Sequence, residues 1–482
     1  MDKVLIKYAS EISLKQAATK KLFQQRVQQH LEAVLEKKGV AVRKFFSWQG
    51  GVIYEVGDLK KSLESLKYIF GIHSYYPLVH ESNSGLESLK KAILHIKPFI
   101  EGKSFVVRCK KWGHYPFKTQ ELERRLGAVL APYGQVKMKD PDVQVQVQLL
   151  NDRAYFFTEK YMGAQGLPIS KKDRVLVLMS GGFDSTVAAW RMLKRGVSVD
   201  FFYCNLRDRA SEKQVLQISK VLVELWGEGS EARFFSVDAN SLVQELKQSI
   251  DPTYRQVVLK RMMYRLAQKV AFKYRLPALV TGESLGQVSS QTLQNLRQID
   301  SSVELPVFRP LIGLDKWEIM QEAKKIGTSI LSEKVLELCQ ISKGQPVIHA
   351  QKKRLDEEES RFDFSVLEAT WETLTVKDVS SLGAKDLKQP YLFVENLPEG
   401  AVIIDCQPRD MYKKWHVPGA ENYEIQELLH DFKKFDKMKT YVLYCPFGTQ
   451  TPFVAEVMQQ HGFSAYAFQG GLSKLKKQVS LS

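Results

Sequence analysis

Residues 174–185 read RVLVLMSGGFDS, an apolar run followed by a glycine-rich loop and the start of a helical pattern. A strand that ends in such a loop and opens a helix directs backbone N–H groups and the positive helix end toward an anion. Gly181 and Gly182 let the backbone approach that anion closely, and Ser180 and Ser185 can hydrogen-bond to its oxygens. The stretch therefore predicts an anion-binding loop between a strand and a helix.

Asp184 is the unusual residue of this loop. A carboxylate beside a phosphate is repelled unless a cation such as Mg²⁺ lies between them, so Asp184 points to a phosphate bound with magnesium. The loop lacks the Gly-Lys-Ser/Thr ending of the Walker type. The plain alternative is an ordinary Ser-Gly-Gly turn in which Asp184 caps the following helix. The strand–loop–helix context favours the binding site.

Apolar strands and helical patterns alternate around this loop, over residues 171–365. Further strands are expected at 197–203, 232–237 and 278–281, and helices near 185–195, 211–226, 240–249 and 256–274. Such alternation is typical of a doubly wound parallel sheet with helices on its faces.

The rest of the chain divides into smaller units, so the expected fold class is multidomain α/β and α+β. Residues 1–60 read as strand, helix and strand, and residues 61–166 as a second α+β unit with a strand at 104–109 and a helix at 118–130. Residues 366–397 read as a linker, and residues 398–482 as a final α/β domain.

The charge balance favours a polyanionic partner. The chain has 70 Lys and Arg residues against 54 Asp and Glu, a formal net charge of +16, and cations set against phosphates release condensed counterions. The stretch 108–118 interleaves basic residues with aromatic ones, a pattern suited to RNA. We expect RNA contacts from Arg108, Lys110, Lys111 and Lys118. The alternative is a basic turn whose aromatic rings are buried.

The cysteines and the hydropathy pattern exclude several classes of protein. Five cysteines in 482 residues do not form a disulfide framework, and no C-x-x-C pair suggests a structural zinc site. No apolar run approaches the roughly 18 residues that span a bilayer. The first residues lack the apolar core of a signal peptide, so a cytoplasmic location is expected.

The loop at 180–185 resembles the PP-loop of ATP pyrophosphatases, which split ATP between its α- and β-phosphates to adenylate an acceptor. Residues 281–293 (TGESLGQVSSQTL), 259–263 (LKRMM) and 309–312 (RPLI) are similar to the matching stretches of the tRNA 4-thiouridine synthetases. Residues 11–15, 108–118 and 166–169 resemble the ferredoxin-like and THUMP domains of that family. The resemblance covers about 365 residues in order.

The resemblance implies that the chain uses ATP with Mg²⁺ to adenylate uridine 8 of tRNA, so that sulfur can displace AMP from C4 and give 4-thiouridine. Mg²⁺ would come with ATP and not with a cage of protein ligands. Asp184 is implied as a catalytic residue, and Lys316 would neutralise phosphate charge, unless it is a surface lysine at a helix start. The implied ATP site comprises Leu178, Met179, Ser180, Gly181, Gly182, Asp184, Ser185, Lys260, Gly282 and Gln291.

Cys445 is the candidate sulfur carrier. It follows the apolar strand 441–444 and precedes a helix, where the helix dipole and free N–H groups stabilise a thiolate. The segment resembles a rhodanese active-site loop, with companion likenesses at 402–406, 415–420 and 470–472, although the loop has no arginine. The resemblance implies a persulfide on Cys445.

Cys339 matches the second cysteine of the family, which implies a redox disulfide between Cys339 and Cys445 after sulfur delivery. Without the family it reads as a small buried hydrophobe. Cys109, Cys204 and Cys406 read as core residues, and Cys204 could also touch adenine. The implied partners are tRNA, a cysteine desulfurase that donates sulfur, the ThiS sulfur-carrier protein and a second copy of the chain in a homodimer.

Two other interpretations remain open. The chain could serve mainly as a sulfur carrier for thiamine thiazole synthesis, which needs Cys445 but not the tRNA-binding domains. It could instead be a non-catalytic tRNA-binding module, which predicts tRNA binding without conversion of ATP to AMP.

Overall fold

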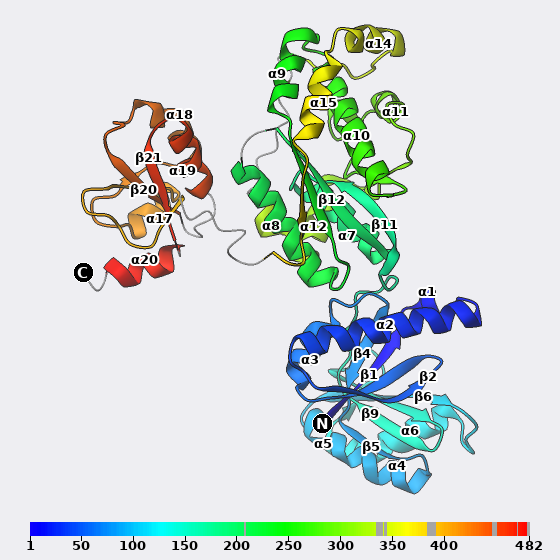
Figure 1. Cartoon of the computed structure of the whole chain (residues 1–482). Helices are drawn as coiled ribbons and strands as arrows, with labels where there is room; N and C mark the ends of the chain where they lie inside the picture. The colour runs from blue at the N-terminus through cyan, green and yellow to red at the C-terminus, as the bar shows by residue number, and fades with distance from the viewer. Residues whose placement is uncertain are drawn as a thin grey trace. The chain divides into compact units, whose positions relative to one another are not determined.

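The computed structural model describes residues 1–206, 209–333, 341, 345–382, 392–445, 451–469 and 471–479, and the chain forms several separate α/β and α+β domains (Figure 1). Each domain is built on its own sheet, in strand orders that do not follow the sequence. No helix in these residues is long and apolar enough to cross a membrane.

The first domain packs helices against an antiparallel sheet of order β10-β4-β1-β3-β2. Its elements are β1 (Asp2–Tyr8), α1 (Ser10–Ser13), α2 (Ala17–Lys37), β2 (Val42–Trp48), β3 (Gly51–Val56), α3 (Leu59–Leu66), β4 (Ile72–Pro77) and β10 (Tyr161–Met162). Apolar residues of α2 recur at helical spacing and bury Val27, Leu31 and Leu35 against the sheet. The helix expected between the two strands of residues 1–60 is therefore present, whereas β2 was not expected.

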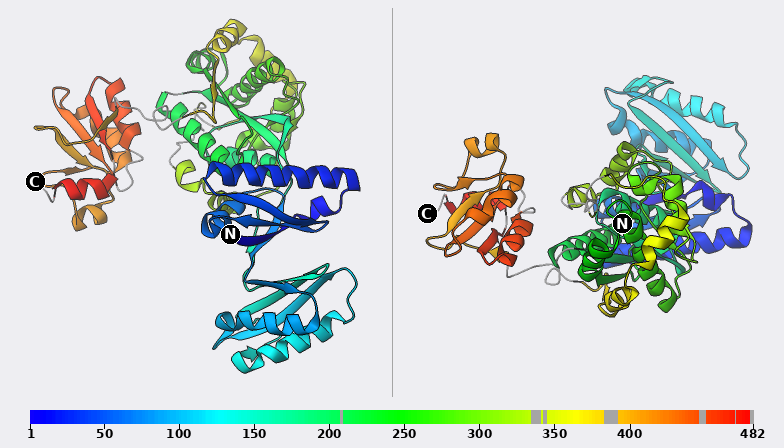
Figure 2. Two further views of the ribbon diagram at one scale, coloured as in Figure 1. Left: turned by 60° about the horizontal axis from the view of Figure 1, so that its bottom comes forward. Right: turned by 90° about the horizontal axis from the view of Figure 1, so that it is seen from above.

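The second domain has a mixed sheet of order β5-β9-β8-β6-β7. Its elements are β5 (His80–Asn83), α4 (Leu86–Ala92), α5 (Lys97–Ile100), β6 (Ser104–Trp112), α6 (Thr119–Leu130), β7 (Gln135–Val136), β8 (Val143–Leu150) and β9 (Arg153–Phe157). All three helices cover one face of the sheet (Figures 1 and 2). Strand β6 is longer than expected, because its whole length to Trp112 pairs with β8.

The central domain carries the glycine-rich loop, on a sheet of order β15-β14-β11-β12-β13-β16. β11 pairs in parallel with β14, β12 with β13 and β14 with β15. Helices lie on both faces of the sheet (Figure 1). Its strands are β11 (Ser170–Leu178), β12 (Val197–Asn205), β13 (Arg233–Asp238), β14 (Leu279–Val280), β15 (Val307–Phe308) and β16 (Thr375–Asp378). Its main helices are α7 (Phe183–Lys194), α8 (Arg209–Trp226), α9 (Asn240–Ser249), α10 (Arg255–Lys273), α11 (Leu293–Asp300), α12 (Lys316–Ile326), α14 (Lys352–Ser360) and α15 (Phe364–Glu372).

The start of the expected linker at 366–397 is corrected by this sheet. Residues 366–372 lie in α15, whose Leu367 is part of the core of the central domain. β16 then pairs antiparallel with β13, in a register that sets Phe235 opposite Val376. The central domain therefore continues at least to Asp378, because hydrogen bonding to β13 completes the edge of its sheet.

The C-terminal domain is built on a parallel sheet of order β17-β21-β20-β18-β19. Its elements are β17 (Phe393–Val394), β18 (Val402–Asp405), α17 (Arg409–Lys414), β19 (Glu421–Asn422), α18 (Ile425–Asp431), β20 (Thr440–Tyr444), α19 (Thr451–Gln460), β21 (Ser464–Phe468) and α20 (Gly471–Val479). Alternate residues of β18 and β20 enter separate apolar clusters on the two faces of this sheet.

Candidate functional site

The glycine-rich loop is held in shape by its own serines. Ser180 N donates to Ser185 Oγ at 3.2 Å, Gly182 N donates to Ser180 Oγ at 3.3 Å, and Ser185 Oγ donates to Gly182 O at 3.3 Å. Gly181 has a φ of +83°, a conformation that favours glycine. Helix α7 begins at Phe183, so the loop lies at a helix N-terminus as expected.

Gly282 lies directly against this loop. It follows β14, which pairs with β11, and a Cβ at residue 282 would lie 2.4 Å from the Asp184 carbonyl carbon and 2.5 Å from Ser185 N. Only a glycine permits this approach. The segment that starts at Thr281 is thereby brought onto the loop, and both had been expected to contribute to one ATP site.

Asp184 makes its contacts beyond the carboxyl ends of the sheet's strands. Its carboxylate accepts hydrogen bonds from Lys316 Nζ at 2.8 and 3.0 Å and from Gln287 Nε2 at 2.9 Å. Lys316 is indeed the first residue of α12, capped by Asp315 and Glu318 in a capping box. Its side chain is 42% exposed, yet its ammonium group reaches the loop. The structure thus brings together two residues that lie 132 positions apart.

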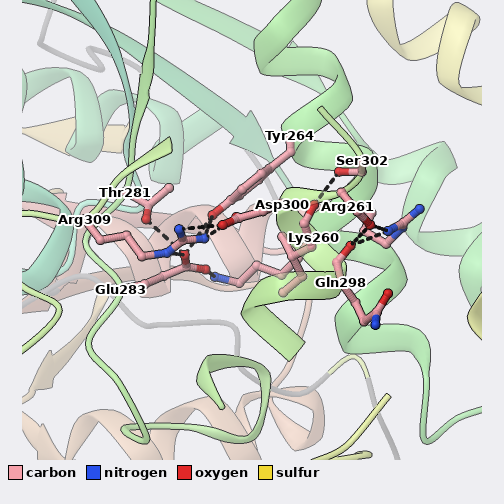
Figure 3. A network of polar contacts seen from close by, with 11 residues as sticks. Lys260, Arg261, Tyr264, Thr281, Glu283, Gln298, Asp300, Ser302 and Arg309 are labelled. Carbon is pink, nitrogen blue, oxygen red and sulfur yellow. Dashed lines mark hydrogen bonds and ion pairs between the residues drawn. The ribbon is translucent and has the colours of Figure 1, made fainter. Parts of the chain in front are cut away.

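Lys260 reaches the same edge through a buried carboxylate, Glu283, which is 2% exposed (Figure 3). Glu283 accepts hydrogen bonds from Lys260 Nζ at 2.9 Å, Tyr264 OH at 2.7 Å, Thr281 Oγ1 at 3.0 Å and Arg309 Nε at 2.9 Å. Burial by itself would raise the pKa of Glu283, but Lys260 and Arg309 lower it to about 2. A fully ionised carboxylate therefore fixes two cations beside the loop.

Sequence reasoning missed Glu283, Tyr264 and Arg309 as site residues, although each lies in or beside a stretch that was singled out. Arg309 also donates to Asp300 Oδ2 at 2.9 Å (Figure 3). On the neighbouring turn of α10, Arg261 is buried and bonds to Glu359 and to the Gln298 carbonyl. Only Arg261 could have been suspected from the sequence, because it precedes Met262 and Met263 on an apolar helix and a buried charge requires a partner.

The remaining residues that were expected in the ATP site lie at the ends of the strands or in the segment after β14. Leu178 ends β11, and Met179 is buried and donates its N–H to Phe202 O at 2.8 Å. Gln291 ends a short 3₁₀ helix and is 7% exposed. Within the described residues, the buried Oε1 atoms of Gln287 and Gln291 have no hydrogen-bond partner, so both can accept from a ligand.

These features fit a phosphorylated nucleotide. Gly181 supplies the positive φ of the loop and Gly282 lets the segment after β14 pack on it. Lys260 and Lys316 supply positive charge, and two buried amide oxygens can accept hydrogen bonds from a base or sugar. The described residues contain no group of three or more His, Cys, Asp and Glu side chains that could hold a metal ion. Cys204 lies in the apolar core of this domain, and burial raises its pKa to about 12.

Cys445 directly follows β20 and is 2% exposed. Its Sγ lies 4.0 Å from the Oγ1 of Thr451, the first residue of α19. The loop residues 446–450, Gly470 and Cys339 lie outside the described residues. The expected disulfide of Cys339 with Cys445 is therefore not among the contacts that the structure describes, where Cys445 is a free thiol.

The basic–aromatic stretch 108–118 begins inside β6 and is partly buried. Trp112 packs edge-on against Trp48 of the first domain, with ring centroids 5.9 Å apart, and Tyr115 OH donates to Asn151 O at 2.6 Å. Arg108 lies 3.9 Å from Glu123, and Lys111 Nζ donates to Phe117 O. Lys110 and Lys118 are exposed. Two of the four expected RNA-binding cations are thus exposed, and the other two are engaged within the domain.

Lys110 belongs to a cluster of lysines where the first two domains meet. Lys7 of β1 lies over the rings of Tyr76 and Trp112, at 5.0 and 5.7 Å. Burial and the nearby charges of Lys110 and Lys160 lower the pKa of Lys7 to about 8. In the described part of the chain, no carboxylate forms an ion pair with these three lysines, so the cluster is suited to bind an external anion.

Comparison with known families matches every domain. The description "Thiamine biosynthesis protein (ThiI)" matches residues 170–364, a ThiI ferredoxin-like domain residues 3–76, a THUMP domain residues 85–159 and a rhodanese-like domain residues 390–478. These matches, with the sheets described above, confirm the expected fold class.

The curated relatives described next share one name, and each matches most of this chain and most of its own length. A tRNA sulfurtransferase of Pyrobaculum aerophilum is 33% identical over 97% of this chain and 97% of its own length. One of Vibrio parahaemolyticus is 36% identical over 83% of this chain and 86% of its own. A solved 4-thiouridine synthetase, in complex with RNA and ATP, is 29% identical, covers 78% of this chain and 99% of its own, and has a TM-score of 0.67.

Proposed function

The chain belongs to the tRNA sulfurtransferase (ThiI) family, and from this membership we propose that it uses ATP to convert uridine 8 of tRNA into 4-thiouridine. The observation that carries the proposal is the meeting of Asp184, Lys316 and Gly282 at the carboxyl edge of the central sheet. The similar synthetase solved with RNA and ATP supports both substrates.

In the proposed first half-reaction the central domain adenylates the uracil C4 oxygen, because this oxygen is a poor leaving group and AMP is a good one. Lys316 and Lys260 would neutralise phosphate charge that develops as pyrophosphate leaves. Asp184 would hold the Mg²⁺ that accompanies ATP, and its hydrogen bonds from Lys316 fix the orientation of the carboxylate. Gln291 and the end of β11 would position the nucleotide.

In the proposed second half-reaction Cys445 carries a persulfide taken from a cysteine desulfurase. The terminal sulfur attacks C4, the C4–O bond breaks and AMP leaves. The thiolate of Cys339 then attacks Sγ of Cys445, which closes a Cys339–Cys445 disulfide and releases 4-thiouridine. A dithiol reductant must reopen that disulfide before the next cycle.

The same persulfide could serve a second acceptor. The match to a family described as a thiamine biosynthesis protein favours sulfur transfer to the ThiS carrier protein for thiazole synthesis. We propose this as a second function, and we propose that two copies of the chain form a homodimer. The proposed domains follow the four sheets: the first domain takes β10 with the residues up to Pro77, the second runs from β5 to β9, the central one from β11 to β16, and the C-terminal one from β17 to α20.

Reconstitution tests the main proposal. The full chain, ATP, Mg²⁺, a cysteine desulfurase, cysteine and unmodified tRNA should yield 4-thiouridine and AMP. Cys445→Ser should abolish 4-thiouridine while adenylation of tRNA still releases pyrophosphate, and Asp184→Ala should abolish both reactions. Cys109→Ala, a buried cysteine in the second domain, is the control and should retain both activities. Normal 4-thiouridine formation by Cys445→Ser would contradict the persulfide step.

A further inference from the structure

Cys406 lies beside Cys445 at the ends of two neighbouring parallel strands. β18 pairs with β20 in a register that sets Ile404 opposite Leu443 and Asp405 opposite Tyr444. The ladder continues for one more step, since Cys406 N donates to Tyr444 O at 2.8 Å. The next two residues in this register are Cys406 and Cys445, and neighbouring strands lie about 4.8 Å apart.

Both thiols point to the same face of the sheet. Side chains alternate along a strand, so a residue shares its face with the residues two positions away. Ile404, Cys406, Leu443 and Cys445 all belong to one apolar cluster, whereas Val442 and Tyr444 belong to the cluster on the opposite face. Cys406 is 4% exposed and Cys445 2%, and both are free thiols.

This placement is compatible with a disulfide, for which Cα atoms usually lie about 4.4–6.8 Å apart. We propose that Cys406 is a second resolving thiol, which attacks Sγ of the Cys445 persulfide and closes a Cys406–Cys445 disulfide within the C-terminal domain. The inference rests on the proposed function only in that it takes the persulfide from it. Both thiols of this pair belong to one sheet of the C-terminal domain.

The reaction balances without an added oxidant. The Cys406 sulfur forms a bond to Sγ of Cys445, the Sγ–S bond of the persulfide breaks, and the terminal sulfur leaves as sulfide with the Cys406 proton. The sulfane sulfur is reduced to sulfide as the two cysteines are oxidised to a disulfide. A dithiol reductant reopens the pair.

The environment of Cys406 makes this attack slow. Burial raises the pKa of the Cys406 thiol well above its usual value, and the neighbouring Cys445 and Asp405 raise it further. Only a small fraction of Cys406 is therefore thiolate at neutral pH, and the thiolate is the nucleophile. The pair discharges persulfide that no acceptor has consumed, and leaves fresh persulfide available for transfer.

The test follows the persulfide on full-length protein that lacks the competing thiol. Cys339→Ser protein is loaded by a cysteine desulfurase, separated from the donor and kept under nitrogen without tRNA or ATP. Persulfide on Cys445, released sulfide and disulfide-linked peptides are measured by mass spectrometry over time. The comparison proteins carry Cys406→Ala or, as a matched buried-thiol control, Cys109→Ala in the same background.

We expect one sulfide per Cys406–Cys445 disulfide in the Cys339→Ser and Cys109→Ala proteins, and a persulfide that survives several-fold longer with Cys406→Ala. Equal persulfide lifetimes, or sulfide loss without this disulfide, would overturn the inference. Treatment with the thiol oxidant diamide adds a readout that needs no persulfide. If the desulfurase fails to place a persulfide on Cys445 but diamide links Cys406 to Cys445, the proposed function fails while the thiol pairing stands. If diamide does not link the two cysteines, the pairing is wrong.

Discussion

Lys316 Nζ lies 2.8 Å from Oδ1 and 3.0 Å from Oδ2 of Asp184, so the first residue of α12 is paired with the loop that precedes α7. The Lys316 stem also passes near the Phe183 ring, with Nζ 5.7 Å from the ring centroid. An exposed ion pair contributes little to stability. The value of this pair is therefore positional, since it holds a cation and a carboxylate at the loop where phosphate charge would develop.

Replacement of Lys316 by Gln should lower kcat for AMP formation by about 100-fold, the usual cost of removing one preorganised donor from a transition state. Stability should change little, because the side chain is 42% exposed. Lys324→Gln, an exposed lysine on the same helix, is the matched control. Wild-type kcat in the Lys316→Gln protein would show that the lysine only starts a helix.

Gly282→Ala should disable the loop although it replaces no charged residue. The new Cβ would meet the Asp184 carbonyl carbon at 2.4 Å, so the loop must shift, and a shift of about 1 Å commonly costs 100-fold in rate. Gly313→Ala is the control, because a Cβ there meets nothing within 4 Å. Both variants are compared for AMP formation and for ATP binding by calorimetry. Similar behaviour of the two variants would contradict the close packing of Gly282 on the loop.

The sequence predicted the glycine-rich loop and the alternation of strands and helices in the central domain. It could not predict the hydrogen-bond network around Glu283. Lys260, Thr281 and Arg309 come from three different elements, and only the folded sheet makes them converge on one carboxylate. Glu283 reads in the sequence as one polar residue in a polar stretch. Its burial becomes visible only once the neighbouring strands are in place.

Among the strands that the sequence pattern did not predict, β2 and β16 share a cause. β2 alternates poorly and leaves Arg43, Lys44 and Phe45 exposed, and β16 exposes most of its four residues. Both lie at an edge of their sheet, where only one neighbouring strand is available and the apolar pattern is weak. Hydrogen bonding to the neighbouring strand forms β2 and β16, and this pairing is not visible in the pattern of apolar residues.

Glu283→Gln should destabilise the central domain by about 3–5 kcal/mol at neutral pH, because it leaves Lys260 and Arg309 without a buried counter-charge. The pKa of Glu283 is lowered from 4.5 to about 2, so its stabilisation is fully present above about pH 4.5. As pH falls through 2 the carboxyl is protonated and that stabilisation is lost. The difference in urea midpoint between wild type and Glu283→Gln should therefore be constant above pH 5.5 and shrink in acid.

Glu304→Gln is the matched control for this experiment, because Glu304 is an exposed carboxylate of the same domain. Its urea midpoint should follow the wild-type value at every pH. A wild-type minus Glu283→Gln difference that does not change between pH 5.5 and 2.5 would mean that Glu283 is not the ionised centre of the network.

The lysine cluster at the junction of the first two domains should make tRNA affinity depend on pH between 7 and 9. The pKa of Lys7 is lowered from 10.5 to about 8 by burial, Lys110 and Lys160. A phosphate held against the cluster would raise that pKa, so binding is accompanied by proton uptake and weakens as pH rises through 8.

Because the lowered pKa means that charged Lys7 disfavours folding, Lys7→Gln should not destabilise the domain. Its tRNA affinity should be lower than wild type at pH 7 and independent of pH, with a salt slope reduced by about one. Lys90→Gln is the control, since Lys90 already pairs with Glu87 at 2.7 Å. Fluorescence anisotropy with labelled tRNA measures all three proteins, and a wild-type affinity that does not change from pH 7 to 9 would rule out a phosphate at Lys7.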